Sequence, residues 1–164
     1  MTDTFLTSVR FVVSEDLKDL REAVDGLPGA ALDWKPAGAD TNSIAVLVTH
    51  VLHSTRSWMC VALGAPLPDR DRDSEFRVKS DDPAALAEFT RDFSGQILAL
   101  LDGAGEVDWS ALRQTQAQFA PSTGRPGNTP GHVPASWAVL HAIEHLREHV
   151  AHVGLTRQLW EARG

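Results

Sequence analysis

Apolar residues recur every three or four positions along four stretches of the chain, which is the spacing of amphipathic helices. These stretches predict helices over residues 4–27, 44–63, 82–103 and 135–161. Local signals mark the boundaries: Pro28-Gly29 stops the first helix, Ser43 is an N-cap for the second, and Asp82-Pro83 opens the third. We therefore expect four helices of about 20 to 27 residues each.

The connections between these helices are long, at roughly 16, 18 and 30 residues, where helix–helix connections usually have about 2 to 8. The third connection contains Val107–Trp109 and Gln114–Phe119, which are either short strands or ordered loop. Because no set of strands competes with the helices, the predicted fold class is all-α, a four-helix bundle with long loops between helices. The chain of 164 residues fits one domain, residues 1–164.

Composition and charge narrow the function classes. The net charge of −7 argues against binding to nucleic acid, which favours a basic surface. The apolar runs are too short to cross a membrane, and the first residues do not resemble a signal peptide. A lone Cys60 permits no disulfide within the chain, as suits a reducing compartment. We therefore expect a cytoplasmic protein that binds neither nucleic acid nor a membrane.

Four of the seven histidines, His141, His145, His149 and His152, stand within twelve residues of the last helix. Steps of 4, 4 and 3 place them within about 80° of one another on one face. Imidazole is the commonest protein ligand for transition metals, so the cluster predicts a metal site; a solvated polar face is the alternative. Glu148 lies beside the histidines as a hydrogen-bond acceptor or general base, or as an exposed ion-pair partner.

Two histidines four residues apart chelate a metal but do not complete its site, and the second helix offers His50 and His53. His50 shares its helix face with Trp58 and should point inward, whereas His53 is rotated by about 60° and should be peripheral. A lone inward histidine is more often a hydrogen-bonded core residue. With His145 and His149, however, His50 would supply three imidazoles and leave positions for water or substrate, as in catalytic zinc sites.

Rival metal motifs fit less well. The segments His141–His145 and His145–His149 both match the H-x-x-E-H pattern of inverzincin proteases, but the overlap arises from the repeated spacing of four. A carboxylate-bridged di-iron site needs Glu-x-x-His on two helices, and the last helix has no such pair. One cysteine excludes the paired Cys spacing of structural zinc modules.

Three segments resemble the DinB-like (YfiT-like) metalloenzyme superfamily. Asn42-Ser-Ile-Ala-Val-Leu-Val-Thr-His50, followed by Arg56-Ser-Trp58, resembles its second helix. Arg70-Asp-Arg-Asp-Ser-Glu-Phe76 is similar to the charged loop of one branch, and the spaced histidines resemble its last helix. The resemblance implies an up-down-down-up four-helix bundle and, as for many members, a homodimer.

The resemblance also implies a divalent transition metal (zinc, nickel or iron) held by His50, His145 and His149. The Gly-Gln that often follows the last ligand is here Ala151-His152, so His152 is a further ligand or a replacement for one of the pair. Characterised members include isomerases and S-transferases that use a low-molecular-weight thiol, mycothiol or bacillithiol.

These observations predict a metal-dependent enzyme that activates a water or a thiol and acts on a small-molecule substrate, such as a thiol-dependent S-transferase. A metal-dependent hydrolase and a non-catalytic, stress-related metal-binding bundle are the alternatives. His152, Glu148 or His141 would orient a ligand or transfer a proton, and no residue is assigned as catalytic.

Overall fold

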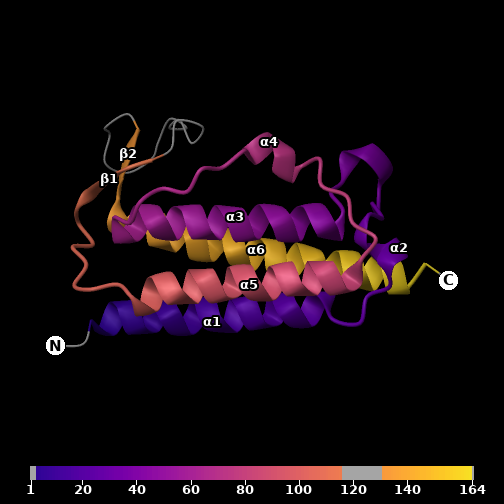
Figure 1. Cartoon of the computed structure of the whole chain (residues 1–164), viewed down its shortest axis with the longest axis horizontal. Helices are drawn as coiled ribbons and strands as arrows, with labels where there is room; N and C mark the ends of the chain where they lie inside the picture. Colours follow the sequence, from indigo (N-terminus) through magenta and orange to yellow (C-terminus); the bar gives the residue numbers. More distant parts are fainter. Residues whose placement is uncertain (1–2, 116–130, 164) are drawn as a thin grey trace.

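The computed structural model describes residues 3–115 and 131–163, and four long helices dominate it. They are α1 (Thr4–Val24), α3 (Ile44–Leu63), α5 (Pro83–Asp102) and α6 (Ala135–Glu161). α1 and α6 run in one direction and α3 and α5 in the other (Figure 1). The prediction of an all-α, up-down-down-up four-helix bundle is confirmed.

Capping side chains explain where three of these helices begin. The Asp3 carboxylate accepts from the backbone N–H groups of Phe5 and Leu6, Ser43 caps α3, and Asp82 caps α5. α3 ends at Gly64, whose φ of 68° lies in the left-handed region that favours glycine. Boundaries of this kind depend only on neighbouring residues, and the ends of α3 lie where the sequence predicts them.

α1 ends at Val24, three residues earlier than its apolar pattern suggests. Asp25 is extended and Gly26 has a φ of 69°, so the helix cannot continue. Leu27 is nevertheless buried, which is why the pattern includes it. The Arg157 guanidinium of α6 donates to backbone carbonyls at this end, those of Glu22, Ala23 and Asp25.

The bundle is a square in which α3 packs between α5 and α6, and α1 packs between the same two helices on the other side. α3 and α5 are parallel, so the connection of residues 64–82 must return along the length of the bundle (Figure 1). This connection carries the one-turn helix α4 (Arg72–Glu75) and lies over α3. As a result α3 is buried on nearly every side, with His53, Arg56 and Leu63 as its only residues that are not.

The other connections hold short elements. The segment predicted as loop between α1 and α3 contains the one-turn helix α2 (Gly29–Leu32) and the 3₁₀ turn η1 (Gly38–Asp40). β1 (Leu112–Gln114) pairs antiparallel with β2 (His132–Pro134) near the start of α6. Of the two strand candidates, Val107–Trp109 forms no strand, and only Gln114 of the second lies in β1.

Trp109 has another role. Its indole N–H donates to Asp3 at 2.9 Å and its ring packs edge-on against Phe5, so its side chain packs against the N-terminal end of α1. Residues 116–119 of the second strand candidate lie outside the described residues. In the described part of the chain, no helix is both long and apolar enough to cross a membrane.

Candidate metal site

Three histidines meet where α3 and α6 pack against each other. His50 comes from the middle of α3, and His145 and His149 come from successive turns of α6. One ring nitrogen from each lies within 4.8 Å of one from both others. The ring centroids of His145 and His149 are 4.4 Å apart, and each is 5.2 Å from that of His50. The structure thus brings together the three histidines that the sequence predicts as ligands.

The two histidines of α6 are held in their neutral form. Burial, followed by the nearby histidines, lowers the pKa of His145 to about 3, and burial and neighbouring histidines lower that of His149 to about 4. At neutral pH each ring therefore carries a lone pair. Histidine binds a cation in its neutral form, so both rings are in the state that a metal site requires.

The Nδ1 atoms of His145 and His149 are buried and have no hydrogen-bond partner within the described residues. A buried polar atom left without a partner costs about 1–3 kcal/mol, so such atoms are rare in native proteins and call for an explanation. Two of them in one cluster of neutral nitrogen donors suit a bound transition metal, with its preference for imidazole. The donor set therefore fits a divalent cation.

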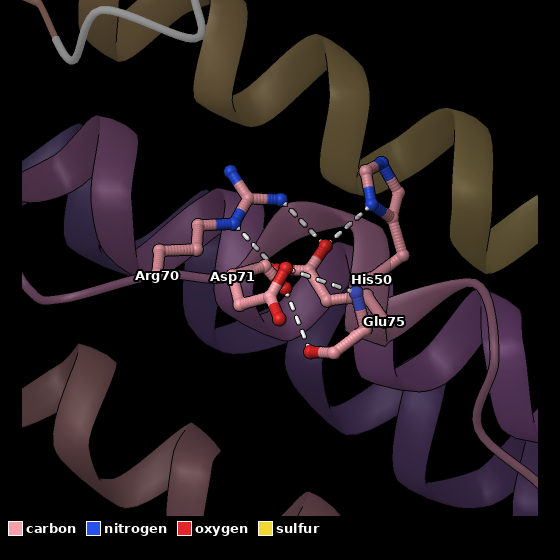
Figure 2. A network of polar contacts seen from close by, with 5 residues as sticks. His50, Arg70, Asp71 and Glu75 are labelled. Atoms are coloured by element: carbon pink, nitrogen blue, oxygen red, sulfur yellow. Dashed lines mark hydrogen bonds and ion pairs between the residues drawn. The ribbon is translucent and has the colours of Figure 1, made fainter.

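Within the part of the chain that the structure describes, Nδ1 of His50 has a hydrogen-bond partner, whereas Nδ1 of His145 and of His149 has none. Nδ1 of His50 lies 2.8 Å from Oε2 of Glu75, and Arg70 donates to both oxygens of the same carboxylate at 2.6 and 2.8 Å (Figure 2). Burial alone would raise the pKa of Glu75, but the hydrogen bonds from Arg70 and His50 outweigh it and lower the pKa. An ionised carboxylate only accepts, so Nδ1 of His50 donates, and in the neutral form of this ring the lone pair is on Nε2.

The surroundings of the cluster are partly apolar. The ring of Phe76 lies 4.7 Å from that of His50, and the guanidinium of Arg72 lies over Phe76. Leu47 is one turn before His50 on α3, and it lines a cavity of about 290 Å³. The cavity is also lined by residues of α6 and of the connection before α3: Pro36, Thr41, Asn42, His152, Leu155, Thr156 and Leu159.

The other candidates lie outside this group of three. His141 stacks on Trp137 and meets Trp58 edge-on, with its ring 5.9 Å from that of His145. His152 is exposed, with its ring 5.6 Å from that of His149. Glu148 is exposed on α6. None of them joins the three-histidine group, which is the only group found within residues 3–115 and 131–163 that could hold a metal ion.

His53 is also outside the group, although it is less peripheral than expected. Its ring packs against α5, with centroids 4.6 Å from Phe93 and 6.0 Å from Phe89. Burial lowers its pKa. The rotation along α3 thus separates His53 from His50 as predicted, but toward another helix rather than toward solvent.

Sequence reasoning assigned no role to Arg70 or Glu75. Both lie in the connection after α3, and the hydrogen bond between His50 and Glu75 spans 25 residues of sequence. No helical or strand period links such positions. The available signal was the similarity of the charged run from Arg70 to Phe76 to a family loop, which does not say which charges are buried.

Comparison with known families agrees with this geometry. The family model described as DinB superfamily matches residues 13–153. The chain belongs to the DinB superfamily. The matched segment contains all three clustered histidines together with Arg70 and Glu75.

Solved structures share the fold at low sequence identity. A conserved protein from Enterococcus faecalis has a TM-score of 0.67 and 14% identity, with 97% of each chain covered. A mycothiol-dependent maleylpyruvate isomerase has a TM-score of 0.63 and 16% identity, over 91% of this chain and 60% of the isomerase. This DinB-superfamily chain therefore spans about 60% of the length of the isomerase. A search of curated proteins finds no match.

Proposed function

We propose that the protein binds one divalent transition metal through His50, His145 and His149 and is a metal-dependent enzyme. The observation that carries the proposal is the cluster itself: three imidazoles with ring nitrogens within 4.8 Å of one another, two of them with a buried Nδ1 that has no hydrogen-bond partner in the described residues. Three protein ligands are the usual number for a catalytic zinc site, which keeps a position for water or substrate. Zinc, nickel and iron all suit this donor set.

The metal, when bound, would supply Lewis-acid chemistry and lower the pKa of a water or thiol that coordinates it. The chain's own residues would bind the metal and orient its ligands. Glu75 and Arg70 hold the ring of His50, and Phe76 shields it on one side. None of the three histidines lines the cavity beside Leu47, but His152 lines it and has its ring 5.6 Å from that of His149, so the cavity offers space for a small-molecule substrate near the cluster.

A thiol as co-substrate is the finer part of the proposal, with S-transfer as its reaction class. It is supported by membership of the DinB superfamily and by the shared fold with a protein named as a mycothiol-dependent isomerase. Metal-dependent hydrolysis with water in place of the thiol is the second candidate, since the same cluster suits it. A homodimer, as in many members of the family, belongs to the proposal as well.

A non-catalytic metal-binding bundle is distinguished from these by its coordination. In such a protein a fourth side chain would complete the metal site, and His152 is the candidate because its ring is 5.6 Å from that of His149. An enzyme instead keeps a position that an external ligand can enter.

Cobalt-substituted protein tests the proposal, because the visible spectrum of cobalt(II) reports its ligands. We expect a small thiol to produce a sulfur-to-metal charge-transfer band in the wild type and in His152→Ala, and no band in His149→Ala. A cobalt spectrum that neither thiol nor azide alters would show a saturated, non-catalytic site. A response to azide but not to thiol would favour the hydrolase.

A further inference from the structure

We propose that Glu75 is a positioning residue of the metal site, so that the connection between α3 and α5 is a functional part of the site. The inference rests on the proposed function for the identity of the ligands. The geometry that supports it is the buried network of Arg70, Glu75 and His50 (Figure 2).

The Glu75 carboxylate restricts both the tautomer and the orientation of His50. Because Oε2 accepts from Nδ1 at 2.8 Å, the proton of the neutral ring is held on Nδ1, and the lone pair stays on Nε2. The same bond limits rotation of the ring about its side-chain torsions. A carboxylate behind a ligating histidine also raises the basicity of the ligating nitrogen. Each effect would strengthen binding of a cation at Nε2.

Glu75 is itself held in place by its neighbours. It is 2% exposed and Arg70 is 8% exposed, so the bidentate ion pair is protected from water. The turn that carries Glu75 is capped by Asp71, whose carboxylate accepts from the backbone N–H of Ser74 at 3.2 Å. Next along the chain, Phe76 packs on the ring of His50. One short segment thus supplies the acceptor, its counter-charge and an apolar cover.

The competing explanation is that the ion pair only fastens the connection to the bundle. Buried ion pairs are often no better for stability than apolar residues of similar volume. A fastening role predicts that an apolar pair would serve equally well and leave metal binding unchanged. A positioning role predicts weaker metal binding even when the fold and its stability are retained.

The test compares zinc affinity, measured by competition with a chelating dye, in matched variants. Glu75→Gln keeps the side-chain shape and removes the charge, while Arg70→Met/Glu75→Leu replaces the pair with apolar groups and guards against a failure to fold. Asp73→Asn, an exposed carboxylate in α4, is the charge-matched control. We expect affinity to fall about 10- to 100-fold in the first two and to change by less than about twofold in the control.

A second readout works without metal. In protein labelled with ¹⁵N-histidine, long-range ¹H–¹⁵N spectra should show His50 protonated on Nδ1 in the wild type and in Asp73→Asn, but as a mixture of tautomers in the apolar double variant. Wild-type zinc affinity in both Glu75 variants, or an unchanged tautomer in a folded double variant, would overturn the proposal. If the wild type binds no zinc, the proposed function fails, while the tautomer experiment still decides the role of Glu75.

Discussion

The clustered histidines differ in whether their buried Nδ1 atoms have a hydrogen-bond partner. Replacing one or another of them with leucine should therefore have opposite effects on the stability of the metal-free protein. His149→Leu removes a buried Nδ1 that has no partner in the described structure. His50→Leu removes the ring that donates to the buried carboxylate of Glu75. The first change should stabilise the metal-free fold and the second should destabilise it.

The magnitudes follow from the cost of an unmade hydrogen bond. A buried polar atom without a partner costs about 1–3 kcal/mol. Leucine has roughly the volume of the imidazole but does not reproduce its ring contacts, so we expect His149→Leu to raise the free energy of unfolding by about 1 kcal/mol. For a chain of this length that is a rise in Tm of about 2–4 °C. His50→Leu should lower the free energy of unfolding by about 1–3 kcal/mol.

Urea unfolding and calorimetry of chelator-treated protein measure both effects. His152→Leu is the control, since its exposed ring should leave the free energy of unfolding within about 0.5 kcal/mol of the wild type. If His149→Leu destabilised the metal-free protein as much as His50→Leu, then Nδ1 of His149 would have a partner in solution. This nitrogen would then not be available for a ligand.

Three further predictions concern pH, the choice of ligand and the metal's effect on stability. The folded pKa values of His145 and His149 (about 3 and about 4) lie below the ordinary value of 6.5. At pH values between the folded and the ordinary pKa, the unfolded chain therefore binds more protons than the folded protein. Metal-free protein should lose stability as pH falls below 6.5, by about 1 kcal/mol per histidine at pH 5 after allowance for partial exposure. Urea titrations in which His145→Leu/His149→Leu shows the same pH dependence as the wild type would contradict this. His50→Ala should weaken metal binding at least tenfold, about 1.4 kcal/mol, and His53→Ala should change it little. If isothermal titration showed that His53→Ala loses the metal and His50→Ala keeps it, His53 would be the ligand. Chelator should lower the Tm by several degrees but leave helical circular dichroism intact at 25 °C, because the buried apolar core does not depend on the metal; complete unfolding would show that the metal is structural.

The parts of the fold that could be predicted from the sequence are those set by near neighbours. Ser43 and Gly64 mark the ends of α3 because a cap bond and a left-handed φ involve only adjacent turns. The inward direction of His50 follows from its helical phase, and the spacing of His145 and His149 places both on one face. Two packed helices then bring these histidines together.

The parts that could not be predicted depend on contacts between distant segments. The pairing of β1 with β2 joins residues about twenty positions apart in a segment without a strand period. Glu75 reaches His50 only because the connection after α3 returns over that helix. Glu148, which is adjacent to His149 in sequence, lies on the exposed side of α6. An exposed position is one of the alternatives that the sequence leaves open for Glu148, and the sequence alone does not decide between them.

The most direct test of the central claim is metal content. Protein prepared without a polyhistidine tag, which would itself carry metal, is reconstituted with zinc or nickel, desalted and measured by elemental analysis. We predict about one equivalent per chain in the wild type, lost in His145→Ala and in His149→Ala. Wild-type protein that retains no metal after desalting would contradict the account of this site.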